Sequence, residues 1–364
     1  MKILFIGSRL YDDVDYYVRQ KNIKSILSES NEDAINLDLP DQVFIVPRGM
    51  DAPKQIAITQ KVDAVVPLIG IDPPLIQVAH MKEELEENYG IPVIAAGVEA
   101  VELTSNKIKT KEFYSKIGVE TPKYQILYSP DDLKLDFPVV LKQGEGQGGK
   151  DIKVAQSMDD VNEYFKVFSQ ALCEEFIDGS ELSIEVLGYN GEYIPLSPIY
   201  KGETTIEGIH PLNKVKLGPC LIEGFDNNLI QHTAYKIAKN LDSDGIFEMD
   251  FMYSHKNHKL YAIEVNTRPN GTRYLTTATC GVNSLCELIN MACGEFSIKN
   301  ILDKLEYYYS SEIPIGNYEG EKINEPLKSF DNNKFIVHGP EGYQRITIRA
   351  KSKNELEKLV NDLT

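Results

Sequence analysis

The chain has 364 residues, of which 42% are hydrophobic and 26% are charged. This is the composition of a globular protein rather than a disordered or fibrous one, and the length predicts two or three domains. The formal net charge of −17 argues against a nucleic-acid-binding surface, because neutralising phosphates requires clustered Lys and Arg. A polyanionic ligand would have to be met by a few local cations.

Membrane and secretion signals are not evident. No apolar run approaches the length of a membrane span, and the first residues, "MKILFIGS", lack the apolar core and cleavage site of a signal peptide. We therefore expect a cytoplasmic protein with no membrane partner. The five cysteines are scattered and form no CxxC pair, which predicts free thiols rather than disulfides or a zinc site.

Residues 1–103 alternate short apolar runs with polar helical stretches, as in "MKILFIGSRL", "DQVFIVPRG" and "VDAVVPLIG". This alternation is typical of a parallel α/β layer. The first turn, "GSRL", has a single glycine, so the dinucleotide-binding fingerprint is missing. We expect a Rossmann-like domain here, without an obvious cofactor.

The pattern changes near residue 104. In "LTSNKIKTKEFYSKIGVETP", Ser105 or Asn106 could cap a helix that ends near Gly118. β-type runs around a glycine cluster, followed by a helix, then predict an α+β subdomain over residues 104–182. Residues 183–364 mix β-type and helical runs, and their C-terminal part shows no chemical motif. That part is expected to complete a sheet or to form an interface.

The glycine cluster "LKQGEGQGGKDI" satisfies both GxGxxG and GxxxxGK. However, Asp151 stands where a P-loop requires Ser or Thr, and "KDIKVA" alternates like a strand where both motifs require a helix. We interpret the cluster as a β-hairpin loop. Its glycines could bring backbone N–H groups close to a phosphate beside Lys142, or it could be an ordinary hairpin tip.

A second polar pattern stands at the end of the β-type run "YAIEVNTR". Glu264 and Asn266, and Arg268 if the strand persists, point to one face because side chains alternate along a strand. They are either a solvated strand end or part of a metal and phosphate site. A strand "FEMDF" beside this one would bring Asp250 near Glu264, with Glu248 on the same face as Asp250.

Five elements occur in a fixed order: Lys107, "VVLK" with the glycine loop, "EEFIDGSE", "FEMDF" and "IEVNTR". This order resembles the ATP-grasp ligases over residues 1–300. The resemblance implies a mixed α/β and α+β fold, in which a Rossmann-like N-terminal domain (1–103) precedes two lobes that clamp ATP. The small lobe would be 104–182 with a glycine-rich lid, and the large lobe 183–364 with the metal site and a C-terminal extension.

The resemblance also implies roles for the matching residues, with ATP and Mg²⁺ as cofactors and Mn²⁺ as an alternative metal. Two lysines would bind the phosphates, and glycines would form the lid. Glu174 would bind the adenine amino group together with the backbone of Phe176 and Ile177, and Glu181 would bind the ribose hydroxyls. These ATP-binding residues are Lys107, Lys142, Gly146, Gly148, Gly149, Glu174, Phe176, Ile177 and Glu181. The metal ligands would be Asp250, Glu264 and Asn266, with Glu248 open as an alternative to Asp250, and Arg268 would be the catalytic cation.

Carboxylate and amide oxygens are ligands that Mg²⁺ prefers, so the residue types agree with this assignment. Weaker signals are His210, in a polar segment, and Arg273 and Tyr274, after Arg268. These three are candidate substrate contacts. Alternatively, Arg273 and Tyr274 only pack or cap the next helix.

Three hypotheses follow for function. The first is an ADP-forming ligase that activates a carboxylate as an acyl phosphate and joins it to an amine, giving an amide or, with two amino acids, a dipeptide, as in the L-amino-acid ligases. Chain length and overall style are similar to aspartate–methionine ligases within that group. The second is an enzyme similar to carbamoyl-phosphate synthase or biotin carboxylase, using bicarbonate. The third is an ATP-binding module without transfer chemistry. Expected partners are small-molecule substrates and a second copy in a homodimer, with no nucleic acid.

Overall fold

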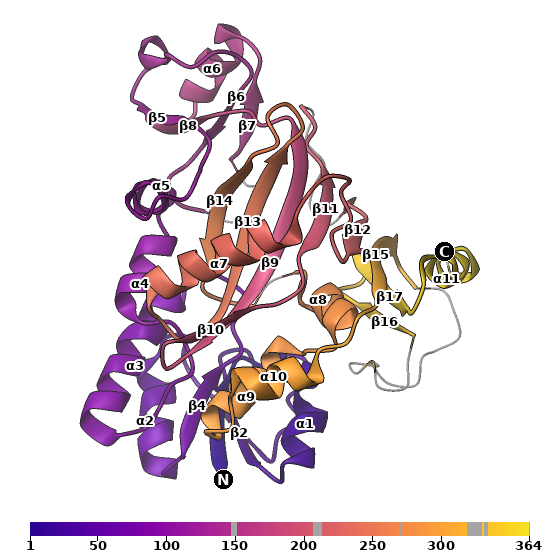
Figure 1. Ribbon diagram of the computed structural model, residues 1–364. Coiled ribbons are helices and arrows are strands. Elements are labelled where there is room, and N and C mark those ends of the chain that lie inside the picture. Colours follow the sequence, from indigo (N-terminus) through magenta and orange to yellow (C-terminus); the bar gives the residue numbers. More distant parts are fainter. Residues whose placement is uncertain (147–150, 207–212, 270, 319–329, 331–333, 364) are drawn as a thin grey trace.

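The computed structural model describes residues 1–146, 151–206, 213–269, 271–318, 330 and 334–363. Three β-sheets organise these described residues (Figure 1). The N-terminal layer lies at one end, a small four-stranded lobe at the other, and a long sheet between them. The predicted mixed α/β fold is confirmed.

The N-terminal layer is a parallel sheet in the order β3-β2-β1-β4. Its strands are β1 (Lys2–Ile6), β2 (Lys24–Glu29), β3 (Gln42–Ile45) and β4 (Ala64–Pro67). Its helices are η1 (Tyr11–Asp13), α1 (Asp15–Gln20), α2 (Asp51–Gln60), α3 (Leu75–Tyr89) and α4 (Val98–Thr104). Gly7, after β1, has a φ of +90° and a Cβ there would lie 3.1 Å from the carbonyl oxygen of Leu68, so this position on the way from β1 to η1 favours glycine.

The small lobe is an antiparallel sheet in the order β5-β8-β6-β7. Its elements are α5 (Lys107–Lys116), β5 (Tyr124–Leu127), η2 (Pro130–Asp132), β6 (Val139–Lys142), β7 (Lys153–Ala155), α6 (Met158–Phe165) and β8 (Ala171–Glu175). The glycine cluster joins β6 to the antiparallel β7, which confirms the hairpin and excludes a P-loop. Asn106 caps α5 through its side chain, as predicted.

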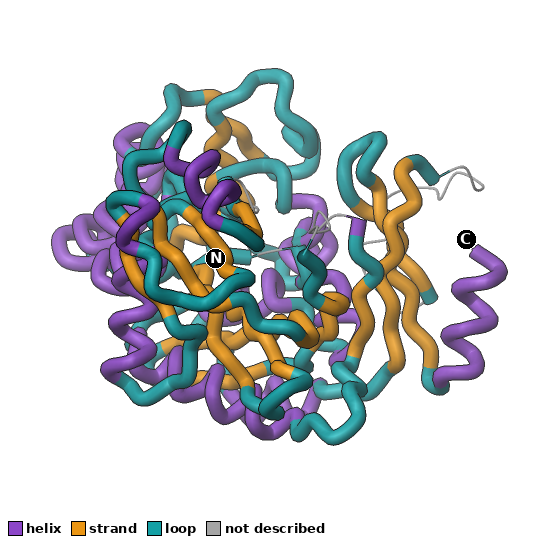
Figure 2. Tube along the Cα trace, turned by 90° about the horizontal axis from the view of Figure 1, so that it is seen from above, coloured by secondary structure: helices purple, strands orange, loops and turns teal. Residues whose placement is uncertain are grey.

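The long sheet has the order β14-β13-β9-β11-β12-β15-β17-β16, with β10 paired to β9. Its strands are β9 (Gly179–Tyr189), β10 (Glu192–Pro195), β11 (Ile199–Glu203), β12 (Lys216–Gly218), β13 (Gly245–Ser254), β14 (Leu260–Asn266), β15 (Tyr309–Gly316), β16 (Phe335–His338) and β17 (Gln344–Ala350). The accompanying helices are α7 (Asn227–Leu241), α8 (Arg273–Cys280), α9 (Ser284–Ala292), α10 (Ile298–Lys304) and α11 (Lys353–Leu363). The C-terminal strands thus complete the sheet, and Figure 2 shows them set to one side with α11. Because β9 begins at Gly179, the expected boundary at 182 falls inside a strand.

Side-chain alternation gives this sheet one apolar face and one polar face. Leu182, Ile184 and Val186 of β9 pack into the apolar core that α7 covers. α7 meets them with residues spaced for one helix face: Ile230, Ala234, Ile237, Ala238 and Leu241. The intervening residues of β9 therefore point to the opposite face, where the polar side chains of β13 and β14 also gather.

Two further expectations concern the chain as a whole. All five cysteines are free thiols, as predicted, and four of them are buried. In the part of the chain that the structure describes, no helix combines the length and apolarity needed to cross a membrane.

Candidate active site

A cavity of about 150 Å³ lies between the small lobe and the polar face of the long sheet. We call it the lobe cavity. Its lining brings together six residues that the sequence assigned to ATP or metal: Lys107, Lys142, Gly146, Glu181, Asp250 and Glu264. They come from five elements of the fold (α5, β6, β9, β13 and β14) and the glycine loop, so the fold collects residues that are far apart in the sequence.

The start of α5 is joined to the glycine loop. The backbone N–H of Lys107 donates to the carbonyl oxygen of Gly144 at 2.7 Å, and the Nζ of Lys107 donates to the carbonyl oxygen of Gly146 at 2.5 Å. Burial lowers the pKa of Lys107, with Glu264 acting against this shift and Lys142 adding to it. Lys107 and Gly146, which the sequence assigned to ATP binding, thus lie together at the cavity. Gly148, Gly149 and His210 lie outside the described residues.

Below the cavity, Glu174 is the counter-ion of two lysines. Its Oε1 lies 2.7 Å from the Nζ of Lys142 and 3.1 Å from the Nζ of Lys111. Burial would raise the pKa of Glu174, but the two ammonium groups outweigh that effect and hold the pKa below its ordinary value. The carboxylate of Glu174 is thus buried against the two lysines and does not line the lobe cavity, and its contact with the adenine amino group stays a prediction.

The residues after β8 and the start of β9 form the next edge of the site. The backbone N–H of Phe176 donates to Pro138 at 3.2 Å, and the carbonyl oxygen of Ile177 accepts from Thr204 at 3.0 Å. Glu181 lines the cavity and its Oε1 lies 2.6 Å from the Nζ of Lys214. Of these three residues, Glu181 is the one whose side chain faces the cavity.

Carboxylates occupy the side of the cavity formed by the long sheet. Asp250 of β13 and Glu264 of β14 are paired directly across the two strands, and Glu248 is paired with Asn266. The predicted proximity of Asp250 and Glu264 is therefore confirmed. Lys201 of β11 lies with its Nζ 2.6 Å from Oδ1 of Asp250. Burial would lower the pKa of Lys201, but Asp250 and Glu248 outweigh it and raise that pKa.

Between the two candidate ligands on β13, the geometry favours Asp250. Glu248 is buried away from the cavity and accepts from Ser183 at 2.7 Å and from Asn266 at 3.2 Å. Burial and the nearby Asp250 raise the pKa of Glu248 to about 8. Asp250 and Glu264 instead face the cavity, where their oxygens could reach an ion.

These two carboxylates fit Mg²⁺. Among the described residues, no group of three His, Cys, Asp or Glu side chains is gathered to hold a metal. Mg²⁺ usually takes one or two carboxylates and completes its shell with water and phosphate oxygens. If phosphate binds at the lysines of the same cavity, this pair of carboxylates is a sufficient protein contribution.

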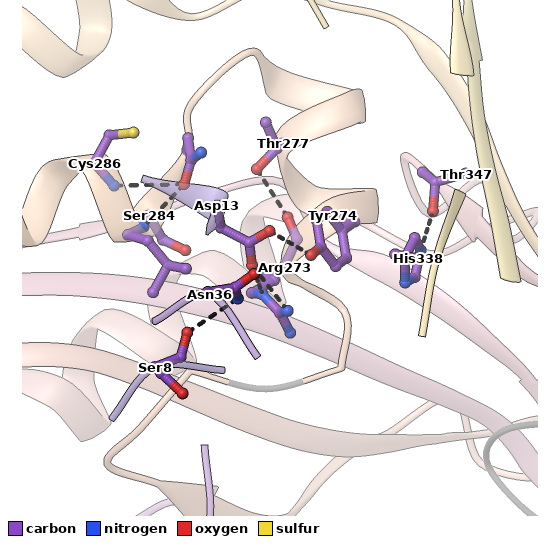
Figure 3. A network of polar contacts seen from close by, with 12 residues as sticks. Ser8, Asp13, Asn36, Arg273, Tyr274, Thr277, Ser284, Cys286, His338 and Thr347 are labelled. Carbon is purple, nitrogen blue, oxygen red and sulfur yellow. Dashed lines mark hydrogen bonds and ion pairs between the residues drawn. The ribbon is translucent and has the colours of Figure 1, made fainter. Parts of the chain in front are cut away.

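Three predicted residues lie at the junction with the N-terminal layer. Arg268 forms an ion pair with Asp72, which follows β4. Figure 3 shows Arg273 and Tyr274 of α8 directed at Asp13: Nη2 of Arg273 donates to Oδ2 at 3.1 Å, and the hydroxyl of Tyr274 donates to Oδ1 at 2.5 Å. Tyr274 also stacks on His338, with ring centroids 4.0 Å apart. Arg273 and Tyr274 thus hold the layers together outside the lobe cavity, which agrees with the packing alternative.

Sequence reasoning missed Lys111, Lys201, Lys214 and Asp72. A signal existed for Lys111, since it follows Lys107 by one helical turn and shares its face. Lys201 and Lys214 had none, because their partners Asp250 and Glu181 are 49 and 33 residues away in the sequence. Only the order of strands brings these pairs together.

Comparison with known proteins gives matches over the whole chain. Residues 104–272 match the family described as "ATP-grasp domain". A protein of Methanobrevibacter smithii called "Carbamoyl-phosphate synthase" is 77% identical over 366 residues, covering 100% of both chains. A carbamoyl phosphate synthase large chain of Thermoanaerobacter sp. is 22% identical over 76% of this chain, which spans 26% of that protein's length.

Solved structures share the fold. The biotin carboxylase domain of Hydrogenobacter thermophilus 2-oxoglutarate carboxylase, in complex with MgADP, ADP and bicarbonate, has a TM-score of 0.79 at 20% identity, covering 100% of this chain and 89% of that one. An L-amino acid ligase from Bacillus licheniformis has a TM-score of 0.77 at 19% identity, covering 100% of this chain and 96% of that one.

Proposed function

Because the chain belongs to the ATP-grasp family, whose members use ATP and Mg²⁺, we propose that it is an ADP-forming ligase that phosphorylates a small carboxylate, with bicarbonate as the first candidate. The observation that supports this reaction is the lobe cavity, where Lys107 and Lys142 face Asp250 and Glu264. Cations for phosphate and carboxylates for a metal are the groups that phosphoryl transfer needs.

The residues at the site would have different roles in this phosphoryl transfer. Lys107 and Lys142 would offset the negative charge of the phosphates, and Asp250 and Glu264 would hold Mg²⁺ beside them. ATP supplies the phosphoryl group that turns one carboxylate oxygen into a leaving group. Arg268 follows β14 by two residues and is not part of the cavity lining; from its place beside Asp72 it would balance the charge of the transferring phosphate.

The relatives support bicarbonate better than an amino acid as the acid. The Methanobrevibacter protein carries the name of an enzyme that makes carbamoyl phosphate, and the Hydrogenobacter structure holds bicarbonate and MgADP. For the lobe cavity we propose one phosphorylation step. A bicarbonate oxygen attacks the γ-phosphorus and ADP leaves; an amine nitrogen then attacks the carbon, the C–O bond to phosphate breaks, and a carbamate forms.

The amino-acid ligase remains the second candidate, and the structural match to the Bacillus licheniformis enzyme is the observation that favours it. In that case the carboxylate of one amino acid takes the phosphoryl group and the amine of another displaces phosphate. The dipeptide product has no support from the named relatives other than this match.

The test follows phosphate and ADP release from ATP and Mg²⁺ in buffer freed of CO₂. Release that requires bicarbonate, and rises with ammonium, supports the proposal. Release that instead requires a pair of amino acids moves the function to the second candidate. Binding of Mg·ADP without release under any of these conditions would leave a nucleotide-binding module and refute the ligase.

A further inference from the structure

Beneath the lobe cavity, α5 supplies a second lysine to the counter-ion of Lys142. The side chain of Lys111 is 0% exposed, its Nζ lies 3.1 Å from Oε1 of Glu174, and it donates to the hydroxyl of Thr121 at 2.7 Å. Lys142 contacts the same carboxylate oxygen at 2.7 Å and also lines the cavity. Lys111 does not reach the cavity, so any effect on a ligand must pass through Glu174 and Lys142.

The summed charge of Lys111, Lys142 and Glu174 determines whether this side of the lobe cavity attracts phosphate. Lys142 and Glu174 alone would cancel, and a neutral pair offers little to a polyanion. With Lys111 included, two ammonium groups face one carboxylate and leave one net positive charge. Water screens buried charges poorly, so this difference is felt in the cavity.

We propose that Lys111 is a positioning residue of the nucleotide site: by sharing Glu174 with Lys142, it leaves Lys142 cationic towards the phosphates of the nucleotide. The inference rests on the proposed function, in which Lys142 holds phosphate. Burial lowers the pKa of Lys111 to about 8 against the pull of Glu174, so the group is charged at neutral pH.

A purely structural role makes a different prediction. Removing one partner of a buried ion pair is costly when the other charge is left unpaired. Glu174 keeps Lys142 as its partner at 2.7 Å when Lys111 is replaced, so this cost is avoided. The hydroxyl of Thr121 also donates to the carbonyl oxygen of Ala262 at 2.8 Å, so this contact persists without Lys111. A variant at position 111 can therefore keep the local structure while changing the charge.

The experiment titrates the full chain with Mg·ADP by calorimetry. Lys111→Met should weaken binding about tenfold, the effect expected from one buried charge near the phosphates. Adding Glu174→Gln removes the carboxylate that now neutralises Lys142, so the double variant should return to within about threefold of the wild type. The control is Lys109→Met, which removes a lysine from an exposed position of the same helix and should leave the affinity unchanged.

The outcomes separate charge from structure. Wild-type affinity in Lys111→Met overturns the inference, and so does a double variant that stays as weak as the single one, because lost packing would not be restored by a second substitution. Lys111→Gln, with thermal unfolding of each variant, provides the same comparison if Lys111→Met does not fold. If the wild type itself fails to bind Mg·ADP, the proposed nucleotide site is wrong.

Discussion

The ion pair between Asp72 and Arg268 predicts that the N-terminal layer contributes to catalysis. Asp72→Asn should lower kcat for phosphate release and leave the KM for ATP unchanged, since Arg268 would lose the group that orients it. The side chains are 29% and 11% exposed. At an effective dielectric constant near 20, two charges in contact attract by about 4 kcal/mol, and partial exposure reduces the net value to about 1–2 kcal/mol. The expected loss is therefore about 5-fold to 30-fold.

A double-mutant cycle shows whether Asp72 acts through Arg268. Rates of phosphate release are compared for Asp72→Asn, Arg268→Met and the two together. If the carboxylate only orients the guanidinium, the double variant should be no slower than Arg268→Met alone. Losses that add to within about 0.5 kcal/mol would refute the reasoning, because uncoupled residues behave additively. Asp13→Asn is the control, since Asp13 joins the same two layers through Arg273.

Lys142→Ala should abolish phosphate release without unfolding the chain. The control is Lys153→Ala, which should keep near-normal rates because this lysine pairs with acids of α6, at 2.9 and 3.2 Å. A normal rate in Lys142→Ala would show that Lys142 is not part of the site. Glu264→Gln should remove the gain in ADP affinity that Mg²⁺ gives the wild type, measured by calorimetry with Mg²⁺ and with EDTA, and an unchanged gain would place the metal elsewhere. Glu312→Gln should lower the free energy of unfolding in urea at pH 7 by about 3 kcal/mol, because it leaves Lys216, 2.7 Å away, buried without its counter-ion. Burial would raise the pKa of Glu312, but its cationic neighbours hold this pKa well below its ordinary value. The stabilisation by the ionised carboxylate is therefore full above the unfolded pKa of about 4.3 and is lost as the pH falls further. A difference in unfolding free energy between wild type and Glu312→Gln that does not shrink below about pH 4 would contradict this.

What the sequence predicted well was local. The hairpin at the glycine cluster followed from the strand-like "KDIKVA", and the shared face of Glu264 and Asn266, and of Glu248 and Asp250, followed from alternation along each strand. Such patterns depend on neighbours within a few residues, which the sequence displays directly. The cap at Asn106 belongs to the same class.

What the sequence could not predict was pairing between distant elements. Glu174 has the expected place in its motif, but its carboxylate is engaged by Lys111 and Lys142, which approach from α5 and β6. Likewise, Arg273 follows β14 closely in the sequence, and only the packing of α8 against the N-terminal layer turns it towards Asp13. A motif therefore identified which residue in the sequence matters, whereas tertiary packing determined which charged residue it pairs with.

The net charge of the whole protein explains why the ion-pair partners at the lobe cavity matter for phosphate binding. A chain with a net charge of −17 repels a polyanion at long range, so a phosphate site has to be a local excess of cations in an otherwise negative field. In the lobe cavity, Asp250 is matched by Lys201 and Glu181 by Lys214, at 2.6 Å in each case. These pairs limit the repulsion from the carboxylates without supplying attraction. The attraction is therefore expected to come from Lys107, from the shared charge of Lys111 and Lys142, and from Mg²⁺ at Asp250 and Glu264. For phosphate binding, the number of charges beneath the cavity thus matters as much as the residues that line it.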